Sequence, residues 1–244
     1  MGARVTRADT GRAAGGDVRA HDLVPPEAGS ELTLRQLELG TDASHVIGTP
    51  IADTLLFVAG GTGSVERDGQ SLPLATGSSV LVPAGSSAGV AAGADGLAVV
   101  EGTVGPACDL HAPMGPTAVL AQLDHVEPGK ATGSRSFQVL FDAGNGSTRA
   151  TLFVGHIPPG KAPWHYHLYD EIVWVVAGEG RLHLGDTVEE LGPGSAFRLH
   201  PREVHIVENT RADRELSVLG LFTPAGSPSA AYLEPDVFAT YTAG

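Results

Sequence analysis

The sequence has 244 residues, of which 15 are lysine or arginine and 28 are aspartate or glutamate, giving a formal net charge of −13 at pH 7. This charge disfavours nucleic acids and anionic membranes as partners, because both are themselves negative. The sequence predicts neither a secretory leader nor a membrane span. The single cysteine, Cys108, excludes a disulfide within the chain and fits a reducing, cytoplasmic location.

Composition also bears on the fold class. Hydrophobic residues make up 42% of the chain, which allows one large core or two small ones. The 33 glycines and 17 prolines suit many short strands joined by tight turns. Because no long stretch shows a helical apolar period, we expect an all-β protein with minor helix.

Five segments follow one another along the chain. Residues 1–28 are rich in glycine, alanine, arginine and aspartate, and we expect them to be loose. Residues 29–104 contain short apolar runs broken by glycines. Residues 105–134 hold several prolines and are interpreted as a linker that contributes an edge strand. Residues 135–223 form a second block of apolar runs, and residues 224–244 form an irregular tail.

The second block carries a set of side chains suited to a metal ion. His165 and His167 stand two residues apart in a strand-like segment, so their side chains point to the same face and reach one ion together. Glu171 opens the next apolar run, which is rich in β-branched residues, and His205 follows further along the chain. A lone histidine on a strand is more often packed or solvated than a ligand, but the combination predicts a metal site.

The donor types narrow the choice of ion. Three imidazoles and one carboxylate suit Fe or Mn, with Ni, Co and Zn as alternatives, and they leave one or two coordination positions open. The set contains no thiolate, which argues against a structural zinc site.

These residues resemble the two motifs of the cupin superfamily, G-x5-H-x-H-x3,4-E-x6-G and G-x5-P-x-G-x2-H-x3-N. The matching positions are His165, His167, Glu171, Gly178, Gly194, His205 and Asn209. The sequence departs from the motifs at three positions: Gly160 is one residue too close to His165, the motif proline falls on His200, and the motif glycine falls on Arg202. The resemblance implies an antiparallel jelly-roll barrel with the metal inside.

An internal repeat extends this interpretation to the whole chain. Displaced by 117 residues, the sequence matches itself without gaps: the segment 57–63 falls on 174–180, and Gly77 falls on Gly194. The period equals one domain, so the chain resembles a bicupin, with tandem jelly-roll barrels at residues 29–104 and 135–223.

The repeat also predicts where a metal is absent. The positions of His165, His167, Glu171 and His205 correspond, in that order, to Gly48, Pro50, Thr54 and Ala88 in the first copy, none of which is a good ligand. We therefore expect an N-terminal barrel without metal that serves packing, the formation of a symmetric homodimer, or the shape of the access route.

Strand alternation predicts the walls of a pocket for a small-molecule substrate. Residues that share the face of the ligands are apolar, as is typical of such sites. They are Val173, Val175, Phe197, Leu199 and Val207. Arg198, His200 and Arg202 are interpreted as solvated surface, with a basic rim for an anionic substrate as the alternative.

The resemblance to cupins favours a metal-dependent enzyme, most simply a dioxygenase, in which Glu171 is also the catalytic proton acceptor. A metal-dependent isomerase, cyclase or lyase remains an alternative, since a Lewis acid also stabilises an enolate. A non-catalytic module that binds a sugar-like molecule is the third interpretation, because a fold does not fix a function.

Overall fold

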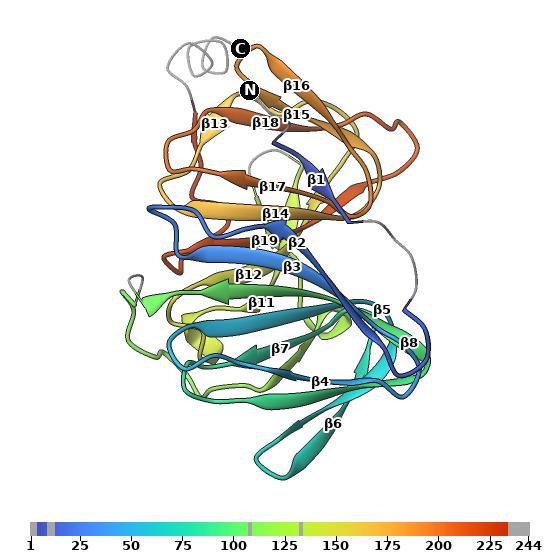
Figure 1. Cartoon of the computed structure of the whole chain (residues 1–244). Coiled ribbons are helices and arrows are strands. Elements are labelled where there is room, and N and C mark those ends of the chain that lie inside the picture. The colour runs from blue at the N-terminus through green and yellow to red at the C-terminus, as the bar shows by residue number, and fades with distance from the viewer. Residues whose placement is uncertain (1–3, 9–12, 107–108, 132–133, 234–244) are drawn as a thin grey trace.

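The computed structural model describes residues 4–8, 13–106, 109–131 and 134–233. Two antiparallel β-barrels are stacked one on the other, and the described helical segments include the short 3-10 turns Leu123–His125 and Ala143–Asn145 (Figure 1). The prediction of an all-β chain with two jelly-roll barrels and minor helix is confirmed. Cys108 and the last part of the tail, residues 234–244, lie outside the described residues.

The N-terminal barrel is one eight-stranded sheet with the order β2-β3-β8-β5-β7-β9, in which β4 also pairs with β8 and β6 with β5. Its strands are β2 (Val18–Val24), β3 (Leu32–Leu39), β4 (Ser44–Ile47), β5 (Asp53–Arg67), β6 (Gln70–Ala75), β7 (Ser78–Val82), β8 (Ala88–Val104) and β9 (Leu120–Gln122). The pairings are antiparallel, as expected of strands joined by short turns.

The C-terminal barrel consists of a seven-stranded sheet, β1-β17-β14-β19-β12-β11-β10, and a five-stranded sheet, β16-β15-β18-β13-β20. Its strands are β1 (Thr6–Arg7), β10 (Gly129–Lys130), β11 (Ser136–Phe141), β12 (Thr151–Ile157), β13 (His165–Tyr166), β14 (Asp170–Ala177), β15 (Gly180–Leu184), β16 (Thr187–Leu191), β17 (Ser195–Leu199), β18 (His205–Asn209), β19 (Leu216–Thr223) and β20 (Tyr232–Leu233).

The strands follow the sequence repeat. Displacing β7 by 117 residues gives the bounds of β17, and displacing β5 gives a stretch that spans β14 and β15. Gly61 and Gly178, which correspond in the repeat, have φ angles of 83° and 92°. A Cβ would lie 2.1 Å from the Gly96 carbonyl oxygen at Gly61 and 2.6 Å from the Glu215 carbonyl oxygen at Gly178. Both positions therefore require glycine.

Both faces of β14 are buried. Val173 and Val175 point into the C-terminal barrel and belong to its core. Ile172 and Trp174 point the other way, into a hydrophobic cluster shared with Phe57 of the N-terminal barrel. Each large apolar side chain buried in this way stabilises the fold by roughly 1.5–3 kcal/mol. The two barrels therefore share a core as well as having one each.

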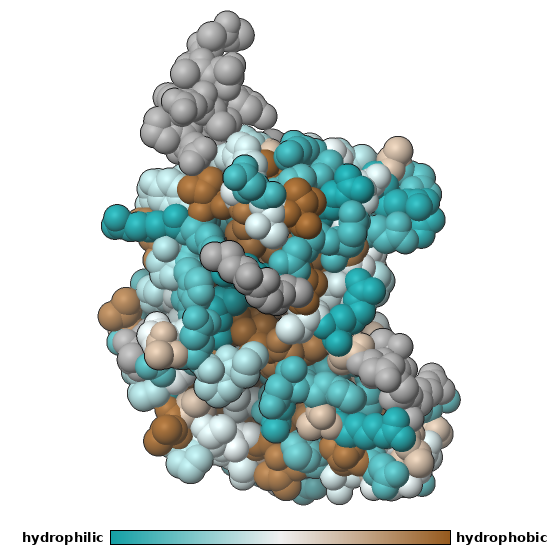
Figure 2. All heavy atoms as spheres, turned by 45° about the horizontal axis from the view of Figure 1, so that its top comes forward, coloured by the Kyte–Doolittle hydropathy of each residue, from teal (hydrophilic) through white to brown (hydrophobic). Residues whose placement is uncertain are grey.

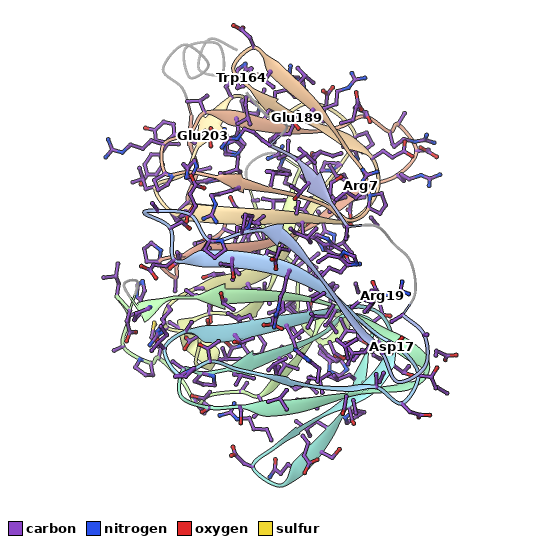
Figure 3. The ribbon with its side chains drawn as sticks, viewed as in Figure 1. Arg7, Asp17, Arg19, Trp164, Glu189 and Glu203 are labelled. Carbon is purple, nitrogen blue, oxygen red and sulfur yellow. The ribbon has the colours of Figure 1, made fainter. Side chains whose placement is uncertain are left out.

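The segment at residues 1–28, expected to be loose, contains two strands in its described part, β1 and β2. β1 pairs with β17 of the C-terminal barrel, and the Arg7 guanidinium donates to Ser195 Oγ at 2.7 Å. Asp17 and Arg19 lie beside the N-terminal barrel, so the chain passes from one barrel to the other (Figure 3). Without β1, β17 would be an unprotected sheet edge.

The segments expected as linker and tail also contribute strands. Residues 105–134 include β9, which pairs with β7 at the edge of the N-terminal sheet, and β10, which pairs with β11. In the tail, β20 pairs with β13. These strands complete sheets that the core strands leave open. An edge strand was expected from the linker, whereas the irregular composition of the tail did not indicate one.

The face in Figure 2 is mixed, with hydrophobic residues interrupting a largely hydrophilic surface. Within the described ranges, no helix is both long enough and apolar enough to cross a membrane.

Candidate metal centre

Three histidines from neighbouring strands meet inside the C-terminal barrel. His165 on β13 lies directly opposite His205 on β18 in the antiparallel register, and their ring centroids are 4.4 Å apart. His167 follows β13, and its ring centroid is 5.1 Å from that of His165. One potential ligand atom from each of the three lies within 4.8 Å of the other two. The side chains are buried, with 7%, 8% and 2% exposed for His165, His167 and His205.

Glu171, at the start of β14, is 4% exposed and lies at the side of this cluster. Its Oε2 is 3.6 Å from Nε2 of His167, but it is not part of the group of three whose ligand atoms are mutually close. The structure thus brings the three histidines together and keeps the carboxylate next to one of them.

Backbone carbonyls orient the imidazoles. Nδ1 of His165 is 3.0 Å from the Pro163 oxygen, and Nδ1 of His205 is 2.9 Å from the Glu203 oxygen. Nδ1 of His167 is 3.5 Å from the Ala230 oxygen in the turn before β20. A ring that donates its Nδ1 hydrogen in this way presents an Nε2 lone pair to an ion.

Burial lowers the pKa of all three histidines. The pKa of His167 falls to about 4, because of burial first and the charge of His165 second. The pKa of His165 and that of His205 are lowered for the same leading reason. The rings are therefore neutral near pH 7, which is the form that coordinates metals. Convergent, neutral and oriented imidazoles fit a divalent transition-metal ion.

Burial has the opposite effect on Glu171, because it disfavours the charged form of a carboxyl group. Burial, followed by the nearby Asp170, raises the pKa of Glu171 to about 8. In the absence of a cation this group retains a proton at neutral pH, while a bound cation would favour the carboxylate.

A cavity of about 340 Å³ opens beside the histidines. Of the expected wall residues, Val173, Leu199 and Val207 line it. Val175 and Phe197 do not, and both are 0% exposed in the core of the barrel. Strand alternation correctly predicted which side of the sheet these residues face. It could not predict how far each lies from the cavity, because residues along one face of β14 extend from the cavity into the packed core.

The sequence analysis missed an aromatic wall. Tyr169 stacks on His167 with a centroid distance of 4.6 Å and on Phe222 at 4.0 Å. Phe222 in turn contacts Phe153 edge-on at 5.9 Å. Burial raises the pKa of Tyr169, so its hydroxyl remains protonated. Since Tyr169 lies two residues beyond His167, the same alternation could have identified it.

Arg198, expected at the surface or on a basic rim, is in neither place. Its side chain is 6% exposed and forms an ion pair with Asp170 at 3.0 Å. Arg202 is exposed and His200 lies near Glu27, with 3.7 Å between Nε2 and Oε1. None of the three lines the described cavity. The outer face of β17 is covered by the N-terminal barrel, and Arg198 is buried with it.

The first copy of the repeat contains no comparable histidine group among its described residues. At Gly48, a Cβ would lie 2.4 Å from the Ser86 carbonyl oxygen, so no ligating side chain fits there. Ala88, at the position of His205, is buried among apolar residues. At the position of His205, the N-terminal barrel thus has an alanine within its apolar core instead of an imidazole.

Residues 153–222 match the cupin domain family, and this segment contains both histidine-bearing motifs. This segment of the chain is a cupin domain. The cupin fold extends over the whole chain: an oxalate decarboxylase variant of Bacillus subtilis is similar with a TM-score of 0.74 and 14% identity, covering 99% of this chain and 84% of that one. A putative glyoxylate-induced protein of Pseudomonas aeruginosa is similar with a TM-score of 0.74 and 15% identity, covering 86% and 82%.

Two curated relatives are more similar in sequence but only over a short region. The L-ectoine synthases of Rhodococcus opacus and Rhodococcus jostii are each 41% identical to this chain over 63 residues. That region is 25% of this chain, and the chain spans 46% of the length of each relative.

Proposed function

We propose that this cupin is a metal-dependent enzyme that acts on a small molecule inside its C-terminal barrel. His165, His167 and His205 would hold one divalent transition-metal ion, Fe or Mn, together with Glu171. The observation that carries this proposal is the convergence of three buried imidazoles, with ligand atoms within 4.8 Å of one another, at the wall of a cavity of about 340 Å³. The Mn(II) centres of a structurally similar Bacillus subtilis oxalate decarboxylase support it (TM-score 0.74, 15% identity).

Each group in the cavity has a role in this proposal. A bound ion supplies Lewis acidity or redox chemistry. Glu171, which a bound cation would keep in its carboxylate form, would accept a proton from the substrate at a carboxylate oxygen. Tyr169 and Leu199 exclude water from the same space, which strengthens electrostatic interactions there.

For the reaction itself, we propose dioxygenase-like oxidation of the small molecule. A second candidate is a lyase, decarboxylase or cyclase reaction without oxygen uptake. The similarity to oxalate decarboxylase and to ectoine synthase favours this second class. A binding module without catalysis is the third candidate.

Turnover under air and under nitrogen separates these candidates. The metal-loaded protein is screened against small organic acids, polyols and enols, with oxygen consumption and product formation as readouts. Turnover that consumes oxygen and stops under nitrogen indicates the oxygenase, and turnover that continues under nitrogen indicates the second class. His205→Ala is the matched control, and activity equal to wild type in this variant would contradict the metal-dependent proposal.

A further inference from the structure

A cation lies in the same cavity as the histidines. Arg135, immediately before β11, lines the cavity and donates from Nη2 to the Val207 carbonyl oxygen at 3.0 Å. Its charge lowers the pKa of His165, His167 and His205, as a minor contribution after burial. Across the described ranges, Arg135 forms no ion pair with a carboxylate.

This lack of a partner is costly. The side chain of Arg135 is half-buried, and this burial lowers its pKa, although the guanidinium remains charged. A guanidinium has five N–H donors in a planar fork, and the one hydrogen bond from the Arg135 side chain leaves most of them without a partner among the described residues. A desolvated cation is favourable only when an anion or further acceptors offset the lost hydration.

The charge of the cavity contrasts with that of the chain. The whole sequence carries a net charge of −13. The described lining has two cations, Arg135 and Lys161, and one carboxyl group, Glu171, which lies beside the histidines. The cavity around Arg135 therefore attracts anions, whereas the chain as a whole, with its net negative charge, repels them.

Apolar side chains form much of the remaining lining, to which Ser134, Ser136, His156 and Ser229 add polar groups. Phe137 and Phe153 contact each other edge-on with centroids 6.5 Å apart, and Ile157 and Val218 are close by in the same lining. At about 340 Å³ the cavity lies toward the small end of ligand pockets, which span roughly 300–1,000 Å³. The ligand that matches has one anionic group and a compact hydrophobic body.

We propose that the substrate is a small amphipathic carboxylate whose carboxylate group is bound by the guanidinium of Arg135. Its hydrophobic body packs against Phe137 and Phe153, and a second oxygen faces the three histidines. Bidentate pairing with a carboxylate is the interaction for which an arginine fork is suited. The orientation toward the histidines rests on the proposed function, while the pairing with Arg135 does not.

The test compares an acid with its neutral isostere. Binding of 3-phenyllactate, 3-phenyllactamide and lactate is measured by calorimetry, with the Mn(II)-loaded protein and with the metal-free protein. The variants are Arg135→Met, Arg135→Lys and, as a matched control, Arg181→Met, whose exposed side chain pairs with Glu190 on the outside of the same barrel. Bound metal and thermal stability are recorded for each.

We expect wild type to bind 3-phenyllactate more tightly than the amide or lactate. Arg135→Met should weaken binding of the acid by about 10- to 100-fold, since a hydrogen bond to a charged group is lost. It should leave amide binding and metal content unchanged. Arg135→Lys should restore part of the affinity, and Arg181→Met should behave as wild type.

Three results would overturn the proposal: equal affinity of wild type and Arg135→Met for the acid, equal affinity of wild type for acid and amide, or no binding of the acid to either form. Failure to take up metal would instead contradict the proposed function. In that case the difference between acid and amide in the metal-free protein still decides the role of Arg135.

Discussion

Arg198 forms an ion pair with Asp170 at 3.0 Å, at the boundary between the two barrels. Both side chains also contact Ser30 Oγ, and Arg198 donates to the Leu32 carbonyl oxygen at 2.9 Å. The other oxygen of Asp170, Oδ1, is buried without a hydrogen-bond partner in the described part of the chain. Because Asp170 precedes Glu171, residues of the N-terminal barrel hold the start of the strand that carries the carboxylate of the candidate site.

Arg198→Met should destabilise the fold by about 3–5 kcal/mol, because it leaves the buried carboxylate of Asp170 without its cation. The variant should also bind metal more weakly, through displacement of Glu171. Urea unfolding and metal titration measure the two effects. In the double variant Asp170→Asn/Arg198→Met, the loss of stability should be smaller than the sum of the single losses. A loss for Arg198→Met as small as that for the surface variant Arg181→Met would contradict this interpretation.

The C-terminal half should not be stable alone. Expression of residues 135–244 would expose Ile172 and Trp174, remove β1 from the edge of β17, and deprive Arg198 of its contacts with Ser30 and Leu32. We expect an insoluble or metal-poor product, measured by solubility and metal content against the full chain. A soluble half with the full metal content and activity of the whole chain would show that the N-terminal barrel is dispensable.

His205→Ala should abolish turnover while the fold is mostly retained. The apolar core of the barrel forms without an ion, unlike that of a zinc finger, so the variant loses a ligand rather than its structure. The control is Trp164→Ala, whose ring packs edge-on against His183 at 6.3 Å and does not line the cavity. Trp164→Ala should lower the melting temperature more than the rate, so equal effects of the two variants on rate would count against the assignment.

Glu171→Gln should separate metal binding from proton transfer. The amide oxygen can still coordinate weakly, so we expect partial retention of metal, with turnover lost because the amide neither accepts a proton nor carries the charge. Metal content and turnover are measured on the same preparation. Full activity in this variant would exclude Glu171 as the proton acceptor.

The sequence was sufficient for the parts of the fold that depend on local pattern. The repeat predicted tandem barrels, and the spacing of His165, His167 and His205 predicted their convergence, because a period of two places alternate side chains on one face. The same reasoning placed Arg198 at the surface, and this was wrong. Alternation tells which side of a sheet a residue is on, but not that a second barrel covers that side.

The sequence pattern also could not predict how far a residue lies from the cavity, or which segments distant in the sequence come into contact. Val175 shares the face of Glu171 yet lies too far along β14 to reach the cavity. Arg135 has no motif around it and reaches the cavity only because β11 packs beside β12 in the folded barrel. The strand at Thr6–Arg7 depends on an edge more than 180 residues away, for which its own composition carries no signal.

Metal analysis of the purified full-length protein tests the central claim most directly. After incubation with Fe(II) or Mn(II) and removal of loosely bound ions, elemental analysis should find one transition-metal ion per chain in wild type and much less in His205→Ala. The reason is that, among the described residues, a group of three convergent imidazoles is found in the C-terminal barrel, whereas Gly48 and Ala88 occupy corresponding positions in the other. No bound ion in wild type, or two tightly held ions per chain, would contradict the account.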